Sequence, residues 1–200
     1  MDAAASGSRV ETLRWRDGRL EMIDQRVLPV EVVYRNYASA AAVAEGIRSM
    51  VVRGAPAIGC AAAYGVALEA LRLAGAPRAQ FDGAMQEAFA VLARSRPTAV
   101  NLFWALKRMR AVSGSVSSAP SAEIAERLLA EAHEILAEDI RINRAMGRHG
   151  AALLDELFND AYTQLAHDLQ EDGEPYFFDP NLDVDVGETS EVWDSVLREA

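Results

Sequence analysis

The sequence of 200 residues predicts a mainly α-helical fold with a small N-terminal antiparallel β-hairpin or sheet, which is an α+β arrangement. Two patterns of apolar residues indicate it. Apolar and polar residues alternate near the N-terminus, as in a half-buried strand, and from about residue 39 onward apolar residues recur at helical spacing. Half of the residues are hydrophobic and a quarter are charged, which is ordinary for a globular protein with a substantial core.

The N-terminal hairpin is predicted from alternation on both sides of a turn. Residues Thr12 to Arg16 alternate between apolar and polar, Asp17-Gly18 is a dipeptide favoured in tight hairpin turns, and the alternation resumes through Met22. A further strand is predicted over Val30 to Tyr34, because β-branched and aromatic residues follow Pro29 there.

A first helix is predicted after this β region. Val43, Ile47, Met50 and Val51 have the spacing of one helical face, and Ser39 stands where a serine side chain would cap the N-terminus. These five positions predict a helix that runs from about residue 40 to residue 51.

The next helix is expected to be the buried centre of the fold. It should open at Pro56, because proline is favoured in the first helical turn, and close before Gly75 and Pro77. Residues Ala57 to Leu73 are nearly all small or apolar, so no face of this helix is suited to water.

Further helices are predicted from residue 80 onward. Gln80 to Arg94 and Thr98 to Val112 are separated at Pro97, and a loop follows over Gly114 to Pro120. Ser121 is then expected to cap a long amphipathic helix that ends at Gly147, with Glu131, Glu134, Glu138 and Asp139 on its exposed face and His133 solvated. A separate amphipathic helix is expected from Leu154 to Leu169, ended by Gly173.

The charge distribution divides the chain into two parts. From Asp155 to Ala200 there are fourteen acidic residues and one basic residue, a net charge of −13, whereas residues 1–154 carry sixteen acidic and nineteen basic residues, a net charge of +3. We therefore predict a body over residues 1–154 and an acidic segment over residues 155–200. We expect the apolar stripe of the acidic segment to pack on the helical body; the alternatives are pairing with a second copy in a homodimer and a helix that stays loose.

Several classes of function are disfavoured by what the sequence lacks. Cys60 stands alone, so there is neither an intramolecular disulfide nor a multi-cysteine zinc site, and His133, His149 and His167 have no partners at metal-ligand spacing. No apolar stretch reaches the roughly 20 residues of a membrane span. Without a secretory signal pattern or a basic stripe, we expect a cytoplasmic protein that binds no nucleic acid, membrane, metal or cofactor.

The stretch from Met50 to Gly59 is the strongest candidate for a site. It places Arg53 and two glycines at the start of a helix, where unpaired backbone N–H groups favour an anion. The alternative is a tight loop that needs small residues for close packing.

The same stretch, Val52-Arg-Gly-Ala-Pro-Ala-Ile-Gly59, resembles the signature of the methylthioribose-1-phosphate isomerases. Their superfamily also holds ribose-1,5-bisphosphate isomerases and regulatory subunits of a translation-initiation nucleotide exchanger. The resemblance covers about three quarters of the chain. It includes Trp15-Arg-Asp-Gly-Arg-Leu20, Asp24-Gln-Arg-Val-Leu-Pro29, Ala61-Ala-Ala-Tyr-Gly65, Arg96-Pro-Thr-Ala-Val-Asn-Leu102 and Gly147-Arg-His-Gly-Ala-Ala-Leu-Leu154.

This resemblance implies an aldose-ketose isomerase of methionine salvage that acts on S-methyl-5-thioribose 1-phosphate. It implies that Arg53, Gly54, Ala55 and Arg96 contact the substrate. Arginine is suited to that role because its planar guanidinium keeps its charge and donates in pairs to phosphate. The alternative for both arginines is an ordinary surface salt bridge, which contributes less than about 1 kcal/mol.

The resemblance stops after Leu154. The family continues into a Thr-His-Cys-Asn-Ala-Gly motif with a catalytic cysteine, and a Rossmann-like C-terminal domain later supplies a catalytic aspartate; residues 155–200 contain neither. Cys60 lies inside the apolar helix and is expected to be a buried core residue. The resemblance therefore supplies no catalytic residue. Three hypotheses about the protein remain: an isomerase homologue that is catalytically incomplete, a non-catalytic sugar-phosphate-binding or protein-interaction module, and a truncated or fused gene product.

Overall fold

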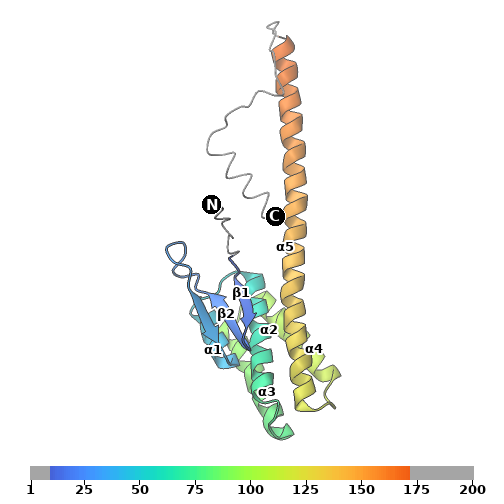
Figure 1. The fold of residues 1–200 in the computed structure, drawn as a ribbon. Helices are drawn as coiled ribbons and strands as arrows, with labels where there is room; N and C mark the ends of the chain where they lie inside the picture. The colour runs from blue at the N-terminus through green and yellow to red at the C-terminus, as the bar shows by residue number, and fades with distance from the viewer. Residues whose placement is uncertain (1–9, 172–200) are drawn as a thin grey trace, which may run out of the picture. The chain divides into compact units, whose positions relative to one another are not determined.

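The structure is a computed structural model that describes residues 10–171, without the side chains of residues 155, 156 and 161–171 (Figure 1). The chain forms two compact units, Met1–Asp139 and Ile140–Ala200, which we describe separately. The predicted fold class is confirmed, because the described residues form five helices after a three-stranded antiparallel sheet. The elements are β1 (Leu13–Arg16), β2 (Arg19–Ile23), β3 (Tyr34–Tyr37), α1 (Ala40–Arg48), α2 (Ala55–Arg72), α3 (Arg78–Ser95), α4 (Val100–Ser115) and α5 (Ser121–Glu171).

The predicted hairpin is confirmed. Strands β1 and β2 pair antiparallel, and Asp17 and Gly18 turn between them with φ of 50° and 71°. Positive φ at both central positions gives a turn whose twist matches that of the flanking strands, and an Asp-Gly pair tolerates it well.

The third strand lies later than the sequence predicts. Val30 and Val32 are exposed in the loop that precedes it, and β3 pairs with β2 from Tyr34 to Tyr37. The predicted strand over Val30 to Tyr34 is therefore wrong except at its last residue. Strand propensity depends on which neighbour the backbone reaches, and here the pairing of Ile23 with Tyr34 decides where the strand begins.

The first helix is confirmed, but it is shorter than its apolar spacing suggests. The Ser39 hydroxyl accepts a hydrogen bond from the backbone N–H of Ala42 at 3.2 Å, as predicted for a cap. Helix α1 ends at Arg48, so Met50 does not lie on its face: it has φ of 60° and is half exposed. Val51 is buried all the same, because the turn after the helix carries it back into the core.

Helix α2 is the buried centre of the Met1–Asp139 unit, as predicted. Every residue from Ile58 to Ala70 is buried, and proline stands in its first turn. A Cβ placed at Gly59 would lie 2.9 Å from the backbone oxygen of Asn101, so glycine is needed for the first turns of α2 and α4 to pack this closely. Helices α3 and α4 begin and end within a few residues of their predicted bounds.

Helix α5 corrects two predictions about the C-terminal half. It runs without interruption from Ser121 to Glu171, through Gly147 and Gly150, where two separate helices were expected. A glycine inside a helix costs only about 1 kcal/mol relative to alanine, and good helix formers on both sides offset that cost. The expected end at Gly173 lies outside the described residues, and the boundary near Leu154 remains a prediction.

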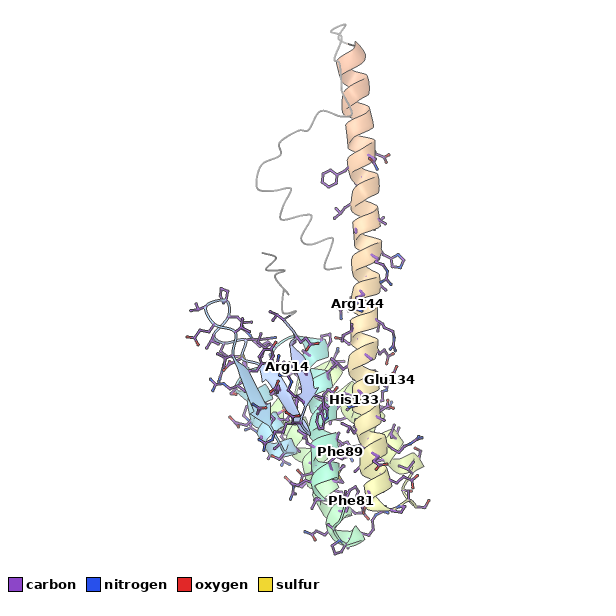
Figure 2. All side chains as sticks on the ribbon, viewed as in Figure 1. Arg14, Phe81, Phe89, His133, Glu134 and Arg144 are labelled. Atoms are coloured by element: carbon purple, nitrogen blue, oxygen red, sulfur yellow. The ribbon has the colours of Figure 1, made fainter. Side chains whose placement is uncertain are left out.

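The expectations for the solvated face of α5 are confirmed in part: His133 and Glu134 are exposed, whereas Glu131 and Glu138 are half-buried. Glu131 and Glu138 both form ion pairs with Arg108 of α4. His133, which is labelled in Figure 2, also contacts the core. Its Nδ1 lies 2.9 Å from the buried Tyr64 hydroxyl, and its ring packs edge-on against the Tyr64 ring. Partly exposed residues of α5 therefore still contact α4 and the core residue Tyr64.

No helix among the residues that the structure describes has the length and apolar character of a membrane span.

Candidate functional site

The candidate site begins at the turn between α1 and α2, where Arg53 and Gly54 lie. Gly54 is the N-cap of α2 with φ of 92° and ψ of 128°, a conformation that side chains disfavour, so the glycine is needed for the backbone path. No side chain caps the helix, and Ala55 is its first residue. Pro56 has no N–H, and the N–H of Ile58 donates to the Gly54 carbonyl, so the first turn of α2 offers an anion the N–H groups of Ala55 and Ala57.

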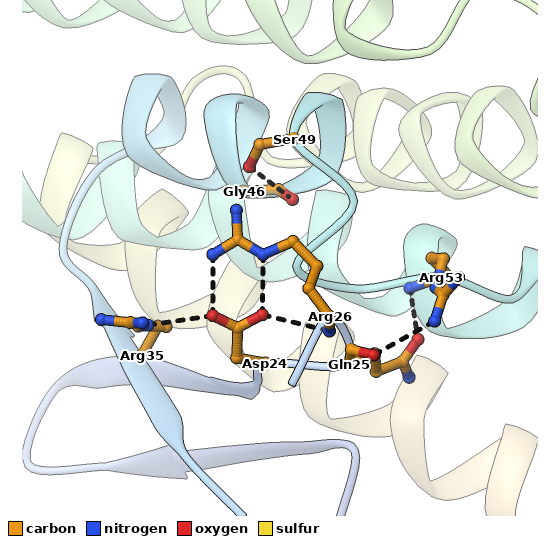
Figure 3. Close-up of polar contacts among 7 residues, drawn as sticks. All are labelled: Asp24, Gln25, Arg26, Arg35, Gly46, Ser49 and Arg53. Carbon is orange, nitrogen blue, oxygen red and sulfur yellow. Dashed lines mark hydrogen bonds and ion pairs between the residues drawn. The ribbon is translucent and has the colours of Figure 1, made fainter. Parts of the chain in front are cut away.

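Gln25 holds this turn in place (Figure 3). Its side-chain oxygen Oε1 accepts a hydrogen bond from the backbone N–H of Arg53 at 2.8 Å, and its backbone carbonyl accepts one from Nη2 of the Arg53 guanidinium at 3.1 Å. The backbone N–H of Gln25 also donates to the carbonyl of Val51 at 2.9 Å. The Arg53 side chain is thus exposed yet oriented by its neighbour, and its other N–H groups have no partner among residues 10–171.

Asp24, next to Gln25, anchors the same loop from inside the fold (Figure 3). Its carboxylate is fully buried and accepts hydrogen bonds from Nε and Nη2 of Arg26 at 2.8 and 2.7 Å, and from Nε of Arg35 at 3.1 Å. The hydrogen bonds from Arg26 hold the pKa of Asp24 well below its usual value, although burial opposes this shift. The charged carboxylate therefore fixes the loop that positions Gln25.

Arg96 lies at the other candidate position, between α3 and α4. It is the C-cap of α3, and its half-buried side chain has no partner among the described residues. Helix α4 starts four residues later without a side-chain cap, as α2 does. Gly59, near the start of α2, packs against Asn101, near the start of α4. The N-terminal ends of the two helices are therefore in contact, and Arg53 and Arg96 lie in the turns that lead into them.

The arrangement offers charge and hydrogen-bond donors, which suit an anion. Cys60 is not available as a nucleophile, because its side chain is buried in α2. Burial also raises the pKa of its thiol to about 12. The predicted role of Cys60 as a core residue is confirmed. Within the described part of the chain, no three histidine, cysteine or carboxylate side chains are grouped as metal ligands would be.

Sequence reasoning gave no role to Gln25 or Asp24. Both lie in the Asp24 to Pro29 stretch that resembles the isomerases, but neither spacing nor residue type signals their contact with a turn 28 residues later. Only the folding of the β2–β3 loop against the α1–α2 turn brings them together.

We expect Gln25→Ala to weaken binding of inorganic phosphate by about 1 kcal/mol, because the Arg53 backbone N–H loses its acceptor and the turn loosens. Isothermal titration calorimetry measures the affinity, and hydrogen exchange of the Arg53 amide should become faster. Gln86→Ala, at an exposed position of α3, is the matched control and should change neither quantity. Unchanged exchange at Arg53 would contradict the assigned role of Gln25.

Comparisons with known proteins agree with this fold and this motif. The profile of the Initiation factor 2 subunit family matches residues 51–167. The methylthioribose-1-phosphate isomerase of Albidiferax ferrireducens is 68% identical over 145 residues, which are 72% of this chain and 41% of that protein. The isomerase of Magnetococcus marinus is 60% identical over 135 residues, 66% of this chain and 37% of that protein.

Two solved structures resemble the same region. The 5-methylthioribose 1-phosphate isomerase from Pyrococcus horikoshii OT3 is 38% identical with a TM-score of 0.63, covering 66% of this chain and 37% of that one. The delta subunit of translation initiation factor eIF-2B from A. fulgidus is 33% identical with a TM-score of 0.61, over 66% of this chain and 38% of that one. The chain spans about two fifths of the length of these relatives. Since the family profile covers more than half of its residues, the chain belongs to the initiation factor 2 subunit family and is a homologue of the methylthioribose-1-phosphate isomerases.

Proposed function

We propose that this chain binds S-methyl-5-thioribose 1-phosphate, with the phosphate held by Arg53, Gly54, Ala55 and Arg96. The proposal rests on one observation: Arg53 is exposed and oriented by Gln25, and it lies next to the N-terminus of α2, which has no side-chain cap and begins after Gly54 with its positive φ. The relatives named as isomerases of this sugar phosphate support the choice of substrate.

The magnitudes indicate which group supplies the affinity. An exposed helix N-terminus favours an anion by about 0.3–1 kcal/mol. A hydrogen bond to a charged group contributes about 1.5–3 kcal/mol, and a guanidinium can make two such bonds to one phosphate. The two arginines therefore dominate the binding, and the backbone of Gly54 and Ala55 adds orientation.

We further propose that this chain alone does not convert the sugar phosphate to its ketose. The 200 residues contain no Thr-His-Cys-Asn-Ala-Gly motif, and Cys60 is buried and held as the thiol. A positioned general acid or base accelerates a reaction by roughly 10²–10⁴-fold, so the loss of two such groups removes most of the rate.

The purified chain should therefore give no ketose above background when it is incubated with methylthioribose 1-phosphate, with product measured by coupled assay or NMR. The isomerase of Albidiferax ferrireducens, assayed in parallel, serves as the positive control. Turnover within about tenfold of a typical enzyme rate near 10 s⁻¹ would overturn the proposal that the chain is catalytically incomplete. Absence of saturable binding of the same sugar phosphate would instead overturn the proposed site.

A further inference from the structure

A groove on the Met1–Asp139 unit lies apart from the sugar-phosphate site. It is bounded by α3, by the end of α4 with the turn that follows, and by the first turn of α5. Its volume is about 360 Å³, within the range of roughly 300–1,000 Å³ that is typical of small-molecule pockets. The floor of the groove consists of buried core side chains, which include Phe81 and Phe89 of α3, both labelled in Figure 2.

The groove and the Arg96 turn lie at different ends of α4. Arg96 precedes the first residue of that helix, Val100, whereas the groove is lined from Arg110 onward. A helix rises about 1.5 Å per residue, so Arg110 lies about 15 Å along the axis from Val100. A small ligand in the groove therefore cannot reach a phosphate bound at Arg96, and the groove is a separate site.

Arg78 and Asp82 form the wall of the groove on α3 and neutralise each other. Nε of Arg78 donates to a carboxylate oxygen of Asp82 at 2.8 Å. Nη1 and Nη2 of Arg78 donate to the backbone carbonyls of Ala119 and Ser117 at 3.1 and 2.6 Å, in the turn before α5. Each guanidinium nitrogen of Arg78 thus already has an acceptor, and the ion pair leaves no net charge on this wall.

Arg110, on α4, is the charged lining residue that this pair leaves unbalanced. Its guanidinium carbon lies 4.1 Å from the centroid of the Phe89 ring, so the cation rests on the aromatic face. Within residues 10–171 it has no hydrogen-bond or ion-pair partner. Contact through its face leaves the N–H groups at its edge for an acceptor. The charged lining residues, two arginines and one aspartate, have a net charge of +1.

Gly114 leaves the groove open beside Arg110, because residues four apart lie on the same face of a helix. It is a lining residue inside α4, and a Cβ added to it would meet no atom within 4 Å. Glycine weakens a helix relative to alanine, and close packing does not require it at this position. The missing side chain corresponds to empty space that any larger residue here would occupy.

We propose that the groove binds a small organic monoanion, a carboxylate with an apolar body. A planar carboxylate matches two N–H groups at the edge of the Arg110 guanidinium, and a single cation balances a single negative charge. A phosphate dianion would need a second free cation, which Arg78 does not supply. The apolar body lies against Phe81 and Met85, which line the groove. The inference goes beyond the proposed sugar-phosphate site and does not depend on it.

Benzoate is a suitable probe, because it combines a carboxylate with a planar apolar ring. Benzamide has the same shape without the charge, and acetate has the charge without the ring. In NMR titrations of the full chain we expect saturable shifts of the amides around Arg110 and Gly114, with benzoate binding at least about tenfold more tightly than benzamide or acetate. Absence of saturation by about 10 mM benzoate would overturn the proposal, as would an affinity for benzamide or acetate equal to that for benzoate.

Removal of the Arg110 charge tests the contact with the anion. Arg110→Gln should lower benzoate affinity at least about tenfold, because a neutral amide replaces the charged donor. Lys107 is an exposed cation on the same helix that does not line the groove, so Lys107→Gln is the matched control and should leave the affinity unchanged. Equal losses in the two variants would overturn the assigned contact, since they would show a general effect of net charge. A loss in Arg53→Ala would also overturn it, by placing benzoate at the sugar-phosphate site.

Filling of the groove tests its location. Gly114→Leu should lower benzoate affinity at least about tenfold, because the leucine side chain occupies the open space. Gly83→Leu is the matched control: Gly83 lies inside α3 and outside the groove, and a Cβ added there also meets no atom within 4 Å. Circular dichroism should show that both variants remain helical, since leucine favours a helix more than glycine does. Benzoate affinity that survives Gly114→Leu in a folded chain would overturn the groove as the binding site.

Discussion

Replacement of Arg53 by alanine should weaken binding of inorganic phosphate or of methylthioribose 1-phosphate by about 1.5–3 kcal/mol, which is roughly 10- to 150-fold in affinity. The guanidinium is exposed, and one of its donors is used by the Gln25 carbonyl, so the remaining donors are the groups that an incoming phosphate would meet. Titration calorimetry measures the affinity, and thermal unfolding measures the stability, which should change little because the side chain is not part of the core.

The control for this substitution is another exposed arginine that is outside the site. Arg94, near the end of α3, pairs with Glu87 at the surface, and Arg94→Ala should leave phosphate affinity unchanged. Arg96→Ala should weaken binding as Arg53→Ala does. If only one of the two matters, the anion lies nearer that turn than the family pattern implies. A loss of stability without a loss of affinity in Arg53→Ala would show that the arginine has a structural role alone.

Replacement of Asp24 by alanine should lower the free energy of unfolding by about 2–3 kcal/mol. The carboxylate is fully buried and accepts hydrogen bonds from two arginines, so its removal leaves Arg26 and Arg35 without their partner. Both arginines are about half exposed, and water can solvate part of their charge, which keeps the loss below that of a wholly buried pair. Urea denaturation followed by circular dichroism measures the change.

Asp82→Ala is the matched control, because Asp82 is an exposed carboxylate paired with Arg78, and it should cost less than about 1 kcal/mol. Acid gives a second readout of the Asp24 contacts. The pKa of Asp24 is lowered in the folded state, so its contribution is complete above the unfolded pKa of about 4 and is lost as pH falls below it. Between about pH 4 and pH 2 the native chain should lose more stability than Asp24→Asn. If the native chain and Asp24→Asn lose the same amount of stability over this pH range, the role of the charged carboxylate is contradicted.

The sequence was sufficient where a local pattern and the final contact involve the same few residues. The Asp17-Gly18 turn, the Ser39 cap and the proline in the first turn of α2 each act within one turn of backbone, so residue type alone predicts them. The buried run of α2 was predicted for a similar reason, since a helix that is apolar on all sides has to lie inside the fold.

The sequence was insufficient where a contact joins distant residues. The position of β3 depends on pairing with β2, and the expected strand over Val30 to Tyr34 failed because propensity does not specify a neighbour. The continuity of α5 through Gly147 was missed for the opposite reason: a helix-weakening residue was given more weight than the long helical segments on both sides of it.

The candidate site divides in the same way. The sequence by itself determined that Arg53 and Gly54 precede a helix and that Arg96 precedes another, because glycine, proline and apolar spacing set those boundaries locally. Only the tertiary structure decided that Gln25 orients Arg53, that a buried Asp24 anchors the loop of Gln25, and that Gly59 lets the two helix starts touch. These contacts join segments far apart in the chain, and their existence depends on the packing of the whole core, which no local pattern encodes.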